Sequence, residues 1–386
     1  MAARHQVTVL EKTPEPSPVG AGVLIQPSGL AVLKGMGLQD PLLALGSKIE
    51  RLHGTLGSGG DRAWQGRRGP TLGWPVMDMR YAAFRSDSFG LGLSRHALIS
   101  ALLDQALGSG AQLRGAQDIA QLASGRGVDG FDLTVIANGS FTQLREQAGI
   151  PSTLTAYPWG ALWILLKDPQ QAVGPVLRQW YRGAHQMLGL MPTGFHRLED
   201  KSAHGATPLI SLFWSVRADQ VEALRAQSLE LWKAQVLSLT PQAKFFLDQI
   251  HDWDQLAWAR YADVRTRRPY NGRVICIGDA AHAMSPQLGQ GSNMALMDAW
   301  CLSRCLNLEH MEGPQIESAF AAYTAARRKH LSTYQFVSKW LTPMFQADGW
   351  FMPAVRNVTF WPGSRLPGSS RLAATLLTGY LFHPND

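Results

Sequence analysis

The sequence predicts an α/β protein of two to three domains, one built around buried parallel strands and another around a sheet covered by helices. Three observations lead to this prediction. The chain of 386 residues is long enough to bury several cores. Segments 7–12 and 274–277 are short and almost continuously apolar, as buried parallel strands are. Helical periodicity lies between such segments, most clearly at 95–107.

Strand and helix signals alternate in the first 140 residues. Residues 27–37 place apolar side chains at helical spacing and close on glycine, which predicts a short helix. Residues 48–92 are rich in Gly, Arg and Trp and predict strands and loops of a different layer. After the apolar stripe of 95–107, residues 131–137 predict a strand that runs into Asn138-Gly139.

Strand and helix signals also alternate in the second half of the chain. Strands are expected at 161–166 and 209–214, with a single helix over 218–236 covering their sheet. The strand at 274–277 leads into Gly278-Asp279, and a long helix begins near Ser292. The last 70 residues predict helices that are broken by four prolines, Pro343, Pro353, Pro362 and Pro367.

Composition excludes several classes of protein. Hydrophobic residues make up 45% of the chain and charged residues 17%, so a disordered chain is excluded. The net charge of +7 favours anions in general, but the basic runs are short and scattered, which argues against nucleic acid.

Three cysteines imply no disulfide framework. Cys301 and Cys305 are interpreted as buried thiols, because no further metal ligand lies near them. No apolar run approaches 18 residues, and a cytoplasmic, soluble or peripheral protein is expected.

A literal Gly-x-Gly-x-x-Gly motif occurs at 125–130. The motif binds a pyrophosphate only where it follows a strand and opens a helix, and here it precedes a strand. We therefore expect an ordinary turn.

The segment from Gly278 to Ala299 carries the strongest chemical signal. A buried strand delivers Asp279 at its carboxyl end, where α/β sheets bind ligands and where a carboxylate accepts hydrogen bonds from sugar-like hydroxyls. Gly289 and Gly291 let the backbone approach a flat ligand, and a helix starting at Ser292 or Asn293 favours developing negative charge. Taken alone, an ordinary strand, loop and capped helix explains the segment equally well.

This segment closely resembles the flavin-contacting motif of the FAD-dependent aromatic hydroxylases, the p-hydroxybenzoate hydroxylase-like monooxygenases that include ubiquinone-pathway hydroxylases. Residues 7–12 resemble that family's second strand, with Glu11 placed to bind the adenosine ribose. Gly20-Ala21-Gly22 with Gln26-Pro27 and the run Arg95-His96-Ala97-Leu98 extend the match, the arginine reaching the cofactor. The resemblance covers about residues 4–335.

The resemblance implies three regions. Segments 1–47, 93–150 and 264–312 would form a discontinuous, Rossmann-like FAD-binding domain. Segments 48–92 and 151–263 would form a mixed-sheet substrate domain, and 313–386 a helical C-terminal tail. The cofactor-binding residues implied by the match are Glu11, Arg95, Asp279, Pro286, Gly289, Gln290, Gly291, Ser292 and Asn293.

The implied reaction uses NAD(P)H to reduce FAD, and O2 to form a flavin hydroperoxide that hydroxylates a small substrate, which we expect to be aromatic. Inward residues of 157–163 and 209–214 would line the substrate pocket, although core packing is the commoner role for any one of them. His282 is interpreted as a positioned loop residue, and no catalytic residue or metal site is identified. No nucleic acid partner is expected.

Three departures from the family pattern keep an alternative open. The first strand, glycine-rich turn and first helix are missing, since residues 1–4 resemble only the end of that helix. The family's Asp-Gly pair, which serves FAD and the nicotinamide cofactor, appears as Asn138-Gly139-Ser140 with Arg145 downstream. Residues 113–130 look short for the usual strand pair. The alternative is a truncated or inactive remnant of the fold that does not bind FAD, or another flavin oxidoreductase on this scaffold.

The C-terminal tail is unusually aromatic. We expect its side chains to pack on the rest of the protein, with peripheral membrane contact or pairing of two subunits as alternatives. The residues concerned are Trp340, Met344, Phe345, Trp350, Phe351, Met352, Phe360 and Trp361.

Overall fold

The computed structural model describes residues 5–14, 22–57, 73–122, 124–202, 206–306, 313–364 and 366–383. Of the segments singled out above, residues 1–4, Gly20 and Ala21, residues 58–72 of the segment 48–92 and the side chain of Trp361 lie outside the described part of the chain.

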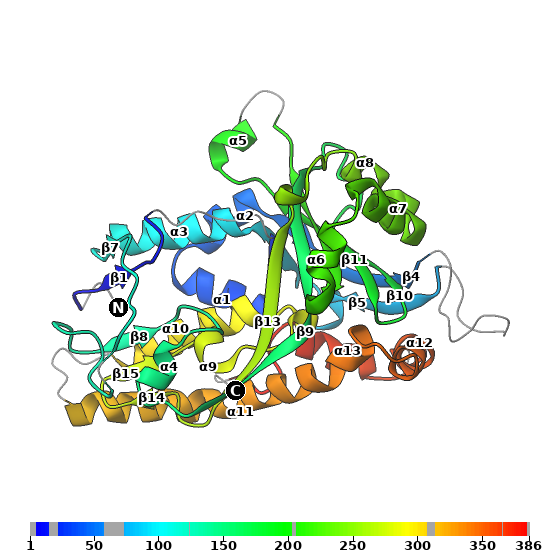
Figure 1. The fold of residues 1–386 in the computed structure, drawn as a ribbon. Coiled ribbons are helices and arrows are strands. Elements are labelled where there is room, and N and C mark those ends of the chain that lie inside the picture. The colour runs from blue at the N-terminus through cyan, green and yellow to red at the C-terminus, as the bar shows by residue number, and fades with distance from the viewer. Residues whose placement is uncertain are drawn as a thin grey trace.

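A seven-stranded mixed sheet forms the largest layer of the molecule (Figure 1). Its neighbours are antiparallel except for one parallel pair, β10 with β4. The long strand β9 pairs with β12 on one side and with the edge strand β13 on the other. In spatial order the strands are β13 (Ala257–Thr266), β9 (Ser152–Lys167), β12 (Leu209–Arg217), β11 (Gln186–Gly194), β10 (Val176–Arg182), β4 (Arg51–Leu56) and β5 (Pro75–Arg80).

Alternation along these strands sends side chains to two different layers. Leu212 and Trp214 pack with Trp232 under α6 (Val221–Arg225), α7 (Leu229–Leu239) and α8 (Lys244–Leu247). Phe213, between them in sequence, joins the apolar cluster on the other face, which includes Phe345 of the C-terminal helices. The α5 helix (Leu198–Ser202) lies between β11 and β12 in the chain.

The single helix expected over 218–236 is wrong. The structure has a short turn of 3-10 helix at Ala218–Gln220, then α6, and then α7 as a separate helix. Ser228 explains the break, because its hydroxyl accepts a hydrogen bond from the backbone N–H of Leu231 and so caps the start of α7.

Three small sheets lie beside the large one. The parallel pair of β1 (Thr8–Leu10) and β7 (Gln112–Arg114) forms one, and β14 (Tyr270–Asn271), β15 (Val274–Cys276) and β8 (Thr134–Ile136) form the second, in which β15 and β8 are parallel. The third has β2 (Gly22–Ile25), β6 (Gly90–Ser94) and β3 (Ser47–Ile49). The strands predicted at 7–12, 131–137 and 274–277 are confirmed with tighter bounds.

Helices cover these small sheets. The α1 helix (Pro27–Gly35) starts on a proline and confirms the prediction at 27–37. The α3 helix confirms the prediction at 95–107. The motif at 125–130 is a turn, in which Gly125, Gly127 and Gly130 all have positive φ. The remaining helices here are α2 (Gln39–Leu45), α3 (Arg95–Gly108), α4 (Leu144–Gln147), α9 (Asp279–His282) and α10 (Gly291–Cys305).

The C-terminal region is helical, as predicted, and its helices are drawn in orange and red in Figure 1. They are α11 (Gly313–Phe345), α12 (Phe351–Gly363) and α13 (Ser369–Leu377). The expected breaks at Pro343, Pro353 and Pro362 are wrong, because these prolines lie in the first or last turn of their helices, where a proline is tolerated. Pro367 lies between α12 and α13, as expected. None of the helices in the described ranges combines the length and apolar character needed to cross a membrane.

The expected packing of the aromatic tail is correct for some side chains and wrong for others. Phe345, Met344 and Phe360 pack into the cluster on the large sheet. Trp340 and Trp350, by contrast, expose most of their side chains.

Candidate flavin site

Two glycines shape the loop between β15 and α10. Gly278 follows the end of the strand with φ +58°, and Gly289 closes the short 3-10 turn Pro286–Leu288 with φ +60°. Both values lie in the left-handed region, where a side chain is strained. The α10 helix begins at Gly291 after Gln290, and neither Ser292 nor Asn293 caps it, so the expected helix start is corrected by one to two residues.

Asn293 fixes the loop to the distant strand β2. Its Oδ1 accepts a hydrogen bond from the backbone N–H of Gln26 over 2.8 Å. Its Nδ2 donates to the carbonyl oxygens of Gly289, 3.0 Å away, and Leu24, 3.2 Å away. The side chain is fully buried and bonded on both its amide atoms. It therefore holds the two walls of the site together.

A buried carboxylate holds the loop from the other side. Asp298 of α10 accepts from the backbone N–H of Gly278 over 2.8 Å, from Arg327 Nε over 2.8 Å, and from His282 Nε2. Burial alone would raise the pKa of Asp298, but the facing charges of His282 and Arg327 hold it well below its usual range. His282 is thus engaged inside the protein, in a positioning role.

The space in front of α10 is open. Among the described residues, a methyl group built on Gly291 would meet one atom within 4 Å outside its own helix, Oδ1 of Asp279 at 3.8 Å. The Asp279 side chain reaches solvent, yet the surrounding protein atoms raise its pKa, an effect that the charges of His282 and Arg95 partly offset. The structure therefore brings Asp279 and Gly291 to one space, within reach of the charge of Arg95.

Five buried polar atoms around this loop have no hydrogen-bond partner within the described residues. They are Gln26 Nε2, Ser28 Oγ, Ser285 Oγ, Gln287 Nε2 and Gln290 Oε1. Gln26 uses its other amide atom, Oε1, to accept from the Tyr81 hydroxyl over 2.7 Å. Buried polar groups in native proteins are almost always bonded, so these atoms leave hydrogen-bonding capacity for a polar ligand or for ordered water.

The segment after α13 closes one side of the cluster. Gln290 Nε2 donates to the carbonyl oxygen of Leu377 over 2.6 Å, and the backbone N–H of Ser28 donates to that of Thr378 over 3.0 Å. His330 Nε2 donates to the carbonyl of Gly379 over 2.9 Å. The sequence reasoning missed this segment, because its contribution is made by backbone carbonyls, which leave no signal in the amino-acid types.

Two of the sequence-predicted positions lie apart from this loop. Glu11 follows β1, and its carboxylate accepts hydrogen bonds from the backbone and hydroxyl of Thr13 at 3.0 and 3.1 Å. Asn138 is exposed at the end of β8. The nearby Arg145 is buried and donates to the carbonyl oxygens of Ala280, at 2.7 Å, and Ser140, at 2.8 Å, so it connects the Asn138 loop with α9.

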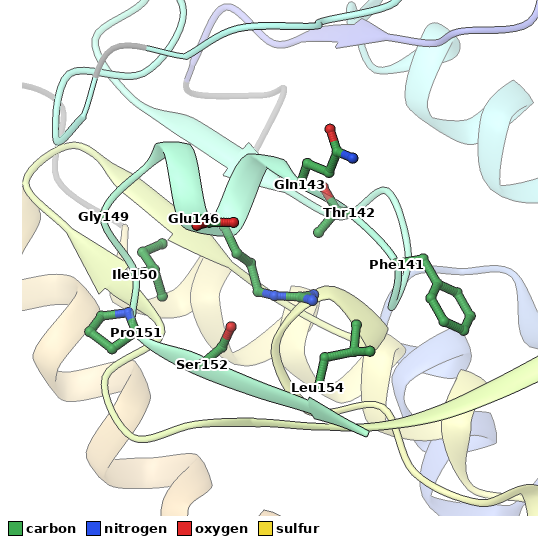
Figure 2. Close-up of a pocket in the computed structure, with 10 residues that line it drawn as sticks. Phe141, Thr142, Gln143, Glu146, Gly149, Ile150, Pro151, Ser152 and Leu154 are labelled. Atoms are coloured by element: carbon green, nitrogen blue, oxygen red, sulfur yellow. The ribbon is translucent and has the colours of Figure 1, made fainter. Parts of the chain in front are cut away.

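A separate cavity of about 650 Å³ lies beside α4 and the start of β9 (Figure 2). It is open to solvent, and Arg260 stacks over the ring of Phe141 at its edge, 4.8 Å from the centroid. The sequence did not single out this cavity. Its lining residues are Phe141, Thr142, Gln143, Arg145, Glu146, Gly149, Ile150, Pro151, Ser152 and Leu154.

The strands expected to line a substrate pocket present an aromatic wall. Trp163 of β9 and Phe213 of β12 are register partners, and their rings stack with centroids 4.7 Å apart. Trp163 Nε1 donates to the hydroxyl of Tyr261 on β13 over 3.1 Å. Burial raises the pKa of Tyr261 to about 12, so the hydroxyl stays protonated. Side chains of both predicted segments thus meet on the same sheet face.

Comparison with known proteins identifies the family of the chain. The family model described as FAD binding domain matches residues 3–334. The Aurachin C monooxygenase/isomerase of Stigmatella aurantiaca is 26% identical over 338 residues, covering 83% of this chain and 78% of that protein. The 6-hydroxynicotinate 3-monooxygenase of Pseudomonas fluorescens is 25% identical over 354 residues, covering 86% of this chain and 84% of that protein.

A solved structure shows the same fold. A variant of Klebsiella pneumoniae HpxO complexed with FAD superimposes with a TM-score of 0.70 at 19% identity, over 98% of this chain and 93% of that one. The family match covers most of the chain and the relatives are monooxygenases. The chain therefore belongs to the family of FAD-dependent aromatic monooxygenases that resemble p-hydroxybenzoate hydroxylase.

Proposed function

We propose that this protein is an FAD-dependent monooxygenase that uses NAD(P)H and O2 to hydroxylate a small aromatic substrate. The observation that carries the proposal is the cluster of buried polar atoms around Gln26 and Gln290, next to the loop before α10, that have no hydrogen-bond partner among the described residues. A flavin ring carries carbonyl, imine and N–H groups along one edge. The cluster offers both amide donors and an amide acceptor, so the residues present fit such a ring.

Particular residues would hold FAD in this region. Asp279 would accept hydrogen bonds from the hydroxyls of the cofactor's chain, and Arg95, whose charge reaches Asp279, would lie near the same part. Gly289 and Gly291 leave room for the ring, which Pro286 and Gln290 would border. Ser292 belongs to the first turn of α10, while Asn293 would act indirectly, by fixing the loop. Glu11 would bind the adenosine ribose.

The start of α10 supplies electrostatic stabilisation. The first backbone N–H groups of a helix have no partner inside it, and the helix dipole adds partial positive charge there. Both effects favour a negative charge at the ring edge next to Gly291 and Ser292. Bound FAD would supply the redox chemistry, accepting a hydride from NAD(P)H and activating O2 for transfer of one oxygen atom to the substrate.

The aromatic wall supports an aromatic substrate. Trp163 and Phe213 offer stacked rings on the sheet face that turns towards the C-terminal helices. Stacking on such rings orients a flat substrate, and the surrounding apolar side chains exclude water. The Tyr261 hydroxyl already accepts from Trp163 and keeps its own proton to donate.

The test uses the full chain. Purified protein is titrated with FAD while flavin absorbance and protein fluorescence are followed, and NADH or NADPH oxidation is then measured in air with a panel of hydroxylated aromatic acids. We expect saturable FAD binding, FAD-dependent oxidation that a substrate accelerates, and a product with one oxygen atom from labelled O2. Absence of FAD binding would support the inactive remnant. Oxidation without oxygen transfer would support another flavin oxidoreductase.

A further inference from the structure

The C-terminal helices expose large apolar side chains on the protein surface. Within the described part of the chain, six such side chains are at least 60% exposed, and all six lie between residues 336 and 372. Single exposed apolar residues are normal on protein surfaces, but a group confined to one region marks an interaction site. The six are Phe336 (61%), Trp340 (60%), Trp350 (65%), Phe351 (62%), Leu366 (64%) and Leu372 (61%). We call them the C-terminal apolar surface.

The spacing of these residues follows the helices. On α11, Phe336 and Trp340 are one turn apart, and their ring centroids are 6.2 Å from each other. On α12, Phe351 and the partly exposed Val358 are two turns apart and lie on one side of the helix. The opposite sides of the two helices contribute Phe345 and Phe360 to the core. Both helices are therefore amphipathic, with an aromatic outer side.

Cations accompany the apolar side chains. Lys339 is exposed next to Trp340, and Arg371 is exposed next to Leu372. Lys329 lies over the ring of Phe382, with its Nζ 4.0 Å from the centroid. Lysine and arginine beside tryptophan and phenylalanine are typical of helices that lie in the interface of an anionic bilayer.

Carboxylates do not balance these cations. Residues 313–383 contain seven Lys and Arg and two Asp and Glu; among the described residues, four of these cations are exposed, whereas Arg327 and Arg356 are buried. Both acids are paired with arginines of other elements, Glu317 with Arg268 and Asp348 with Arg217. The surface therefore has an excess of positive charge that repels a second copy of itself and attracts a negatively charged partner.

We propose that the C-terminal apolar surface docks the protein on the surface of an anionic phospholipid bilayer. The aromatic side chains would insert at headgroup level, and Lys339 and Arg371 would contact lipid phosphates. The proposal does not depend on the redox function. It places α13 at the membrane, and this helix ends at Leu377, whose carbonyl accepts from Gln290 of the flavin site.

The test is co-sedimentation of the full chain with extruded vesicles. Vesicles of phosphatidylcholine alone are compared with vesicles that also contain phosphatidylglycerol, at low and at physiological salt. We expect binding to the anionic vesicles that weakens with salt. The double variant Lys339→Gln/Arg371→Gln should lower the partition coefficient about thirtyfold. The variant Trp340→Ser/Phe351→Ser should abolish binding at both salt concentrations.

Matched controls distinguish binding through the C-terminal apolar surface from non-specific adsorption to vesicles. Leu231→Ser removes an equally exposed leucine (58%) from α7, and Lys34→Gln removes an exposed lysine from α1. Both should bind like the unchanged chain, and thermal melts should show that all variants fold. Failure to bind anionic vesicles would overturn the proposal. So would a concentration-dependent dimer that Trp340→Ser/Phe351→Ser dissociates, because the occupant would then be a second copy.

Discussion

Gln290 and Leu377, 87 residues apart in sequence, are joined by a 2.6 Å hydrogen bond from the glutamine amide to the leucine carbonyl. The bond fastens the segment after α13 to the loop that would border the flavin. It also leaves Gln290 Oε1 as a buried acceptor without a partner among the described residues. The wall of the site is therefore completed by the C-terminal segment.

Gly379 should be sensitive to substitution for this reason. Its φ is +85°, and a methyl group there would lie 2.0 Å from Ser28 Oγ and 3.3 Å from Gln290 Oε1. We expect Gly379→Ala to detach the segment and to lower the free energy of unfolding by about 2–4 kcal/mol. Limited proteolysis and chemical denaturation measure the two effects. Gly368→Ala is the control, since Gly368 has φ +80° and no atom within 4 Å; an equal loss there would show that strain alone is responsible.

Gly291→Ala tests the open space before α10. The added methyl would meet protein only at Asp279 Oδ1, 3.8 Å away, so the chain should fold and even gain helix propensity. A ligand packed against Gly291 would be displaced, at a cost of about 1–3 kcal/mol, or roughly tenfold to a hundredfold in FAD affinity. Isothermal titration with FAD is the measurement. Gly313→Ala, at the start of α11 with no atom of the described residues within 4 Å, should leave the affinity unchanged. Equal affinities in both variants would place the flavin elsewhere.

Asn293→Ala should lower stability as well as flavin binding. The substitution leaves the buried N–H of Gln26 and two carbonyls without their partner, which corresponds to about 2–4 kcal/mol in the free energy of unfolding. Denaturant unfolding gives the value. Asn138→Ala, at an exposed position, should change it little. A small effect at Asn293 would mean that the loop is held chiefly by Asp298.

His330 predicts a dependence of stability on pH. Burial and the neighbouring charge of Arg327 lower the pKa of His330 from its ordinary 6.5 to about 3, so the folded protein holds the neutral ring. The unfolded chain binds the extra proton between these values, and stability is therefore present above about pH 6.5 and lost as the pH falls towards 3.

The measurement compares denaturant unfolding at pH 7 and pH 5. The loss attributable to His330 is about 2 kcal/mol, and His330→Gln should show a correspondingly smaller loss between the two pH values. Asp298 does not contribute to this difference, because a carboxyl with a lowered pKa titrates below both pH values. An unchanged pH dependence in the variant would show that His330 is accessible to protons in the folded state.

Local patterns in the sequence predicted the part of the fold that depends on near neighbours. The strand at 274–277, the loop with Gly289 and the following long helix were predicted, because apolar runs and glycines act within a few residues. The helix over 218–236 was predicted wrongly, since the hydroxyl of Ser228 ends one helix and starts another within an otherwise periodic stretch.

The remaining features of the site depend on contacts between distant segments. Nothing around Asn293 indicates that its partners are Gln26 and Leu24, and the composition of 377–379 does not show that three carbonyls point at the site. The outward Trp340 and the inward Phe345 lie five residues apart on the same helix, and only the position of the large sheet decides between them.

The hydrogen bond between Asn293 and Gln26 also determines when the site can form during folding. It joins residues 267 positions apart, so the loop closes only after most of the polypeptide has collapsed. Closure over such a separation is slow compared with the growth of a helix. Assembly of the cofactor pocket should therefore be a late event. A coenzyme present in the refolding mixture should bind the late, nearly native conformers and should not direct the early steps of folding.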